Sequence, residues 1–170
     1  DATAPHRFRA DALTELDSYG VLIVHSAVAK ADSTDTVVSL SLADGTTIQG
    51  DALVLATGVH DELPPVEGLA ARWGKSVFNC PFCDGWDWRG KRMAVYAPDD
   101  GAKYAGTLCA WSEDVTLLTD GRKAPRGEAM DTFLALGGKV RTEPLASIVS
   151  SGGHVEAVRF QAGAPLPCET

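Results

Sequence analysis

The sequence lacks three features that would each place it in a class of protein. No stretch approaches the ~18 consecutive apolar residues of a membrane-spanning helix. Lys and Arg number 15 against 23 Asp and Glu, and the net charge of −8 disfavours nucleic acid, whose phosphates attract basic surfaces. The pattern G-x-G-x-x-G, whose glycines let a helix N-terminus approach a dinucleotide pyrophosphate, occurs nowhere. We therefore expect no membrane partner, no nucleic-acid partner and no intact dinucleotide fingerprint.

Cysteine is scarce as well, at 4 residues in a chain of 170. Small secreted domains that depend on disulfides are much richer in it. The segment from Asp1 to Arg7 shows neither an initiator Met nor the apolar core of a signal peptide. With 45% hydrophobic and 22% charged residues, the composition is that of an ordinary globular protein. These features predict a cytoplasmic location.

Two of the cysteines, Cys80 and Cys83, form a Cys-Pro-Phe-Cys motif that Asp84 and Gly85 follow. Cysteines at this spacing can form a small-ring disulfide, and such a pair lowers the pKa of one thiol so that it attacks as a thiolate. An acid directly after the second cysteine could pass the proton that thiol–disulfide exchange requires. The motif predicts a redox centre whose catalytic residues are Cys80, Cys83 and Asp84.

A structural zinc site is the competing interpretation of this motif. Zinc needs four ligands in recognisable pairs, but Cys109 and Cys168 stand alone and the histidines show no matching spacing. A permanent structural disulfide is disfavoured by the low cysteine content. We therefore expect redox chemistry and no metal ligands.

The first part of the chain is predicted to be a helix followed by a small antiparallel sheet. Residues 7–19 have apolar side chains on one helical face, and the β-branched residues of 21–28 favour a strand. Asp44-Gly45 is a strong turn signal inside a hairpin over 36–49. The apolar run within 51–58 predicts a strand buried on both faces, as in a parallel sheet.

After a connector over 59–74, strands alternate with helices. The expected elements are a strand at 91–97, a helix at 102–112, a strand at 114–119, a helix at 128–136, a strand at 139–141 and a hairpin over 145–161. Such alternation implies right-handed βαβ crossovers and a parallel sheet. The predicted fold class is α/β, with a Rossmann-like βαβ unit after a small antiparallel meander.

The order of these motifs resembles a known family, the low-molecular-weight thioredoxin reductase group of flavoproteins. The matching residues are Leu-Val-Leu-Ala-Thr-Gly at 53–58, Cys-x-x-Cys-Asp-Gly at 80–85, Val-Tyr-Ala-x-Asp-x-x-Ala at 95–102 and Asp-Val-Thr-Leu-Leu at 114–118. More narrowly, Cys-Pro-Phe-Cys-Asp-Gly-Trp is similar to the thioredoxin-reductase-like dithiol oxidases. The resemblance covers essentially the whole chain, is most specific over 52–119, and implies the central portion of a longer protein.

The resemblance implies roles for individual residues. Cys80 and Cys83 would exchange electrons with a flavin, Cys83 being the flavin-facing thiol, and Asp84 takes the place of the family's acid. The strand end that approaches FAD in relatives is matched by Ala56, Thr57 and Gly58. Residues 1–64 would be a segment of the FAD-binding domain, and residues 71–170 most of the nicotinamide domain, which carries the Cys-x-x-Cys pair.

The nicotinamide site departs from the family pattern. Where relatives have G-x-G-x-x-A, this chain has Ala97-Pro98-Asp99-Asp100-Gly101-Ala102, which loses the tight turn and the close backbone approach to a pyrophosphate. Asp99 and Asp100 suit a helix N-terminus but repel a dinucleotide phosphate. Asp120, at the end of the next strand, could hold a ribose diol. The candidate nicotinamide contacts are therefore Gly101, Ala102 and Asp120, although NAD(P)H use is not favoured.

These departures shape the functional hypotheses. The leading one is a dithiol oxidase that passes electrons from a small-molecule dithiol to FAD and oxygen with weak or no NADPH use; reduction of a thioredoxin-like protein is second. FAD is implied by the resemblance, but this chain alone is not expected to hold it, because the glycine turn is missing. The apolar run Leu53–Leu55 needs cover from a homodimer partner or a complementing chain. The alternative is a truncated, non-redox relative that binds a ligand or partner without flavin.

Overall fold

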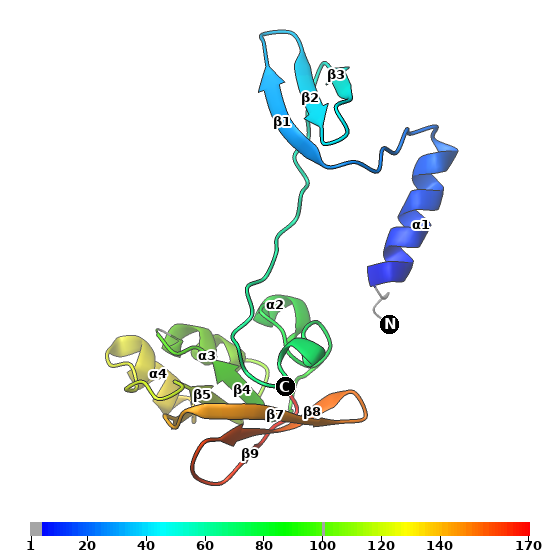
Figure 1. Cartoon of the computed structure of the whole chain (residues 1–170). Coiled ribbons are helices and arrows are strands. Elements are labelled where there is room, and N and C mark those ends of the chain that lie inside the picture. Colours follow the sequence, from blue (N-terminus) through cyan, green and yellow to red (C-terminus); the bar gives the residue numbers. More distant parts are fainter. Residues whose placement is uncertain (1–4, 100) are drawn as a thin grey trace. The chain divides into compact units, whose positions relative to one another are not determined.

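The computed structural model describes residues 5–99 and 101–170, so Asp100 lies outside the described residues. The chain divides into two units, residues 1–59 and 60–170 (Figure 1). The division falls close to the predicted domain boundary, while the assignment of the units to FAD and nicotinamide domains stays a prediction. No helix in the described ranges is long and apolar enough to cross a membrane.

The first unit contains a helix and an antiparallel meander. Helix α1 (Pro5–Ser18) precedes strands β1 (Val28–Ser33), β2 (Val38–Leu42) and β3 (Thr47–Gly50), which pair in the order β1-β2-β3. The β2–β3 turn forms at the predicted Asp-Gly pair, because Asp44 accepts a hydrogen bond from the Thr46 N–H at 2.9 Å and Gly45 adopts a φ of +87°. The predicted helix and hairpin are confirmed.

Two strand predictions in this unit are wrong. Residues 21–27 form no strand, and β1 begins only at Val28. The predicted buried strand at 51–58 is absent too, and its apolar side chains are exposed, with Val54 at 86% and Leu55 at 78%. β-branched and apolar residues favour a strand, but a strand also needs a neighbour that accepts its hydrogen bonds. Among the described residues no strand pairs with either segment.

The second unit is built around a parallel sheet. Strands β4 (Met93–Tyr96), β5 (Val115–Leu118) and β6 (Lys139–Arg141) pair in the order β4-β5-β6 and are connected by helices α3 (Ala102–Leu108) and α4 (Glu128–Ala135). The helices cover one face, where Val95 and Leu117 pack with Ala105 and Phe133 (Figure 1). The predicted βαβαβ unit is confirmed, with each helix shorter than expected.

A second, antiparallel sheet covers the other face of the parallel sheet. It consists of β7 (Leu145–Ser151), β8 (His154–Phe160) and β9 (Leu166–Pro167), in that order. Leu118 of β5 packs with Leu145, Val158 and Phe160 of this sheet. The hairpin was predicted, whereas β9 was not, because a two-residue strand that includes a proline carries no periodic signal. The predicted α/β fold class is confirmed.

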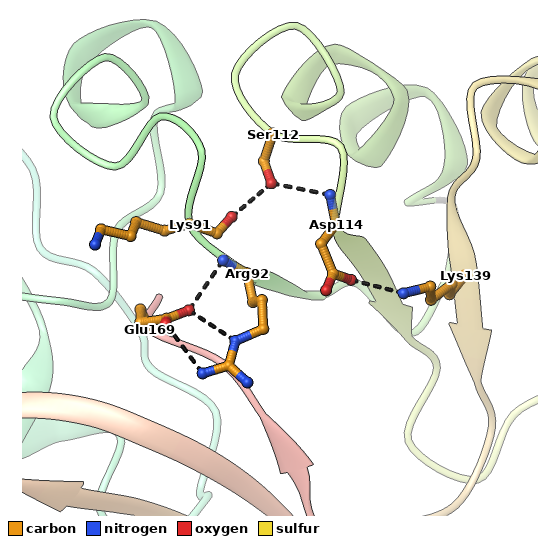
Figure 2. A network of polar contacts seen from close by, with 6 residues as sticks. All are labelled: Lys91, Arg92, Ser112, Asp114, Lys139 and Glu169. Atoms are coloured by element: carbon orange, nitrogen blue, oxygen red, sulfur yellow. Dashed lines mark hydrogen bonds and ion pairs between the residues drawn. The ribbon is translucent and has the colours of Figure 1, made fainter.

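A polar network joins the strand beginnings of the parallel sheet. The Glu169 carboxylate accepts hydrogen bonds from the Arg92 backbone and guanidinium at 2.9 to 3.1 Å (Figure 2). Ser112 bridges the Lys91 carbonyl and the Asp114 N–H, and Asp114 pairs with Lys139 at 2.9 Å (Figure 2). Because this network lies at the strand beginnings, the carboxyl ends, where ligands of open α/β sheets bind, stay available for a site.

Candidate functional site

The Cys-x-x-Cys motif forms a short helical turn with its cysteines joined. Cys80 and Cys83 make a disulfide with their Cα atoms 5.3 Å apart, inside the range that disulfides require. The predicted proximity is confirmed. Helix α2 (Pro81–Asp84) begins with proline, whose missing N–H costs nothing at that position. Cys80 is extended and caps this helix, because its sulfur accepts a hydrogen bond from the Cys83 N–H at 3.2 Å.

The two cysteines differ in their surroundings. Cys83 is exposed and lies next to Phe82, whose side chain is 77% exposed. Cys80 is half-buried, and Pro81 beside it is buried. A protein or a planar group can therefore reach Cys83 from outside, whereas Cys80 is oriented toward the body of the second unit.

Asp84 ends the redox turn and is half-buried. Burial, and to a lesser extent the charge of Asp87, raise the pKa of the Asp84 carboxyl above its ordinary value. A raised pKa keeps the acid protonated to higher pH and suits a group that passes protons to or from a thiolate. The predicted role of Asp84 as the acid stays a prediction that this environment favours.

Side chains near helix α3 hold the redox turn. The Tyr104 hydroxyl donates a hydrogen bond to the Asn79 carbonyl oxygen at 2.8 Å, and the Asn79 side chain donates to the Asp61 carboxylate at 3.3 Å. At the other end of the turn, a Cβ placed on Gly85 would lie 2.6 Å from the Trp111 ring. Sequence reasoning did not identify Tyr104 or Asn79, because their contacts are between residues distant in the chain and no motif marks them.

A cavity of about 490 Å³ lies beside the disulfide within the second unit. Its lining is mainly apolar and includes Cys80, with aromatic walls from Trp73, Phe78 and Trp88. Polar lining groups come from Asn79, Asp84 and Tyr104. A mainly apolar hollow of this size with a few polar groups is typical of a small-molecule site.

The loop from Ala97 to Ala102 is where the resemblance places a dinucleotide pyrophosphate, and its described residues are engaged in packing and in an ion pair. A Cβ on Gly101 would overlap Ala97 and lie 2.8 Å from Leu117, so this glycine serves close packing of α3 on the sheet. Ala102 is 1% exposed. The Asp99 carboxylate forms an ion pair with Arg122, whose loop also carries Lys123 and Arg126 around a shallow hollow. This ion pair engages the Arg122 guanidinium, which leaves less positive charge for a phosphate near the loop.

Asp120 already has partners for both carboxylate oxygens. One accepts the Leu145 N–H at 2.7 Å, and the other accepts the Tyr96 hydroxyl at 3.3 Å. Its φ of +49° is in the left-handed region, which Asp tolerates better than most residues. These contacts account for Asp120 as a link between β5 and the antiparallel sheet. A contact to a ribose diol stays a prediction.

The candidate FAD residues lie in the first unit. Ala56, Thr57 and Gly58 are exposed and belong to no strand. An FAD site needs a glycine turn at a helix N-terminus and a groove for the rings. These three residues by themselves supply neither, and the expectation that this chain alone does not hold FAD stays a prediction.

The remaining cysteines lie outside the redox motif and are not activated. In ranges 5–99 and 101–170, no group of three or more His, Cys, Asp or Glu side chains could hold a metal ion. Cys168 is buried, which raises the pKa of its thiol to about 11. Burial also raises the pKa of the Cys109 thiol. Neither thiol is therefore activated as a thiolate at neutral pH.

Comparison with known proteins identifies the family. No family model matches the chain. A protein named thioredoxin reductase tcpT from Claviceps purpurea (strain 20.1) is 33% identical over 182 residues, which cover 98% of this chain and 56% of that protein. The crystal structure of HlmI superposes with a TM-score of 0.87 at 24% sequence identity. The match covers 100% of this chain and 55% of HlmI.

The crystal structure of a putative thioredoxin reductase, TrxB from Bacillus anthracis, superposes with a TM-score of 0.82 at 24% sequence identity. The match covers 99% of this chain and 57% of TrxB. At this identity the two crystal structures establish the fold, and the curated relative establishes the kinship. The chain spans about half the length of these proteins. It belongs to the thioredoxin reductase-like family of FAD- and NAD(P)-dependent disulfide oxidoreductases, as a partial representative.

Proposed function

We propose that this chain carries out the dithiol–disulfide exchange of a thioredoxin reductase-like flavoprotein of the dithiol oxidase type. The observation that carries the proposal is the Cys80–Cys83 disulfide at the edge of a mainly apolar cavity. A small-molecule dithiol in this cavity would approach Cys80, while Cys83 stays exposed for the family's electron acceptor. The assignment of Cys83 as the flavin-facing thiol agrees with its exposure.

The exchange balances without a further reagent. One thiolate of the substrate attacks the Cys80 sulfur, the Cys80–Cys83 bond breaks, and Cys83 leaves as a thiolate. The second substrate thiol then attacks the mixed disulfide, which releases Cys80 and closes the substrate disulfide. Two electrons pass to the cysteine pair, and the two substrate protons end on its thiols. Asp84, which directly follows Cys83 and ends α2, would pass one of these protons to the Cys83 thiolate.

The dithiol oxidase subtype is supported by the state of the nicotinamide loop. Ala97 and Asp99 stand where the fingerprint has its first two glycines, and the Asp99 carboxylate engages the Arg122 guanidinium. In this type of reaction, FAD and oxygen would reoxidise the pair without NADPH. We assign no flavin step to the described residues and infer that a second copy or a complementing chain completes the flavin site.

Reduction of a thioredoxin-like protein is the second candidate. It is favoured by the name of the curated relative and by the exposed aromatic rings of Phe82 and Trp86 next to Cys83, which a protein partner could contact. A non-redox relative that binds a ligand in the cavity without flavin is the third candidate. The first candidate predicts that the substrate reacts with Cys80, the second that it reacts with Cys83, and the third that it reacts with neither.

Trapping an adduct distinguishes these candidates. With Cys83→Ser, the Cys80 thiolate should attack an aromatic disulfide without a second thiol, such as dibenzyl disulfide, to form a benzyl mixed disulfide on Cys80 and release phenylmethanethiol. Neither Cys83 nor a second substrate thiol can then resolve this adduct. The matched variant Cys80→Ser should accumulate far less adduct on Cys83, as measured by peptide mass spectrometry. An adduct that forms mainly on Cys83 would favour an exterior, protein-type substrate. Absence of adducts from both variants would contradict the redox proposal.

A further inference from the structure

The segment that enters the redox turn is anchored by a side chain of helix α3. The Tyr104 hydroxyl donates to the carbonyl oxygen of Asn79 at 2.8 Å, and Asn79 directly precedes Cys80. The two residues are 25 positions apart, so the contact is tertiary and does not follow from the turn itself. Because a peptide unit is planar, holding the Asn79 carbonyl also fixes the direction in which the chain enters Cys80.

The exit of the turn is fixed against residues just after the same helix. Gly85 donates its N–H to the Pro81 carbonyl at 3.0 Å and packs so closely on the Trp111 ring that no Cβ would fit. Tyr104 therefore holds the entry of a turn whose exit is closely packed. We expect motion of the turn upon reduction to be greatest at the Cys80 end, where the Tyr104 bond lies.

The environment of Tyr104 keeps its hydroxyl a donor. Burial, and then the negative charge of Asp84, raise the pKa of the Tyr104 phenol above its ordinary value. Tyr104 also lines the cavity with Cys80 and Asp84, so one side chain contacts the redox turn from the cavity side.

We propose that Tyr104 is a positioning residue that holds Cys80 in its disulfide geometry and thereby sets how readily the Cys80–Cys83 pair is reduced. The inference rests on the proposed exchange function, because it concerns the same disulfide. When a dithiol reduces the pair, the sulfur–sulfur bond breaks and Cys80 gains freedom that the Tyr104 bond opposes. The hydrogen bond therefore stabilises the oxidised turn more than the reduced one, and its loss favours reduction.

The test is a redox equilibrium of the full chain with mixtures of reduced and oxidised dithiothreitol. Free thiols are trapped by alkylation, and the Cys80–Cys83 peptide is quantified apart from Cys109 and Cys168. For Tyr104→Phe we expect the equilibrium constant to shift about five-fold toward the dithiol, as loss of one hydrogen bond predicts. That shift corresponds to roughly 20 mV, at 29.6 mV per tenfold.

Tyr96→Phe is the matched control, because Tyr96 also donates its hydroxyl within the second unit, to Asp120 at 3.3 Å, but contacts neither Asn79 nor the redox turn through it. Its equilibrium should equal that of the native chain. Tyr104→Leu, which also lacks the hydroxyl, should shift in the same direction as Tyr104→Phe, and circular dichroism establishes that each variant is folded.

Native equilibrium constants in both Tyr104 variants would overturn the inference while leaving the proposed function intact. An equal shift in Tyr96→Phe would overturn it as well, since the effect would then report general loosening of the unit. Failure of the proposed function has a different readout, which is the absence of adducts from both Cys80→Ser and Cys83→Ser in the trapping experiment. The two failures are therefore distinguishable.

Discussion

The sulfur of Cys80 accepts a hydrogen bond from the backbone N–H of Cys83 at 3.2 Å, so the same cysteine both forms the disulfide and caps the helix that carries its partner. Helix α2 has only four residues and therefore depends on its cap and its tertiary contacts more than on its length. The redox state of Cys80 and the local structure of the turn are thus coupled.

This coupling predicts different costs for two replacements of Cys80. Under reducing conditions, Cys80→Ser should be more stable than Cys80→Ala by about 0.5–1 kcal/mol, because the serine hydroxyl can cap α2 and a methyl group cannot. Urea denaturation of both variants measures the difference in the free energy of unfolding. Equal stabilities would mean that the cap is not formed in solution.

The packing of Gly85 on Trp111 predicts a sharp difference between two glycines. Gly85→Ala should destabilise the second unit by about 1–3 kcal/mol, because the new Cβ overlaps the Trp111 ring and the Pro81 carbonyl. Gly106→Ala is the control, since no atom lies within 4 Å of its Cβ position inside α3. Helix propensity makes that change neutral or stabilising by up to about 1 kcal/mol. Thermal unfolding that ranks the two variants the other way would contradict the packing.

The raised pKa of Asp84 predicts a pH dependence of stability. The folded state holds the Asp84 proton more tightly than the unfolded chain, so stability falls as the pH rises from about 4 through the raised pKa. Asp84→Asn cannot titrate and should lose this part of the decline. Melting temperatures of both proteins measured from acidic to neutral pH give the difference curve. A difference that stays constant across this range would show that Asp84 titrates normally.

Sequence patterns predicted the second unit much better than the first. The alternating strands and helices from Lys91 to Arg141 form as expected, because βαβ crossovers bring each strand next to its neighbour within the chain. The apolar run at 53–57 carries an equally strong strand signal but forms none, since its hydrogen-bonding neighbours are not among the described elements. Strand propensity becomes a strand only when a partner is present.

The sequence predicted the disulfide of the candidate site but not the hydrogen bonds that surround it. Spacing alone indicated that Cys80 and Cys83 could pair, and the structure joins them. The hydrogen bonds that Asp120 accepts from Tyr96 and the Leu145 backbone were not foreseen, while its predicted contact to a ribose stays a prediction. Tyr104 gave no signal, because a hydroxyl that reaches a carbonyl across 25 positions leaves no periodic trace.

Nucleotide binding by this chain is predicted to be weak. Ala97 and Asp99 in place of the first two fingerprint glycines, and the ion pair that engages Arg122, disfavour a pyrophosphate, and Ala56–Gly58 supply only a fragment of a flavin site. Calorimetric titration of the 170-residue chain with NADPH, NADH and FAD should show no sub-micromolar binding of any of them. Sub-micromolar binding of NADPH or NADH would refute the account of the loop, and stoichiometric FAD in a purified monomer would refute that of the flavin site.

The most direct test of the central claim is a redox titration of the disulfide in the native chain, followed by alkylation and peptide mass spectrometry. We predict a reversible two-electron transition in which Cys80 and Cys83 become alkylated together, while Cys109 and Cys168 give the same signal in both states. The midpoint should lie above about −300 mV, below which structural disulfides typically lie. A pair that resists reduction until the protein unfolds, or that fails to re-form when the titration is reversed, would contradict the claim that this disulfide is a redox centre.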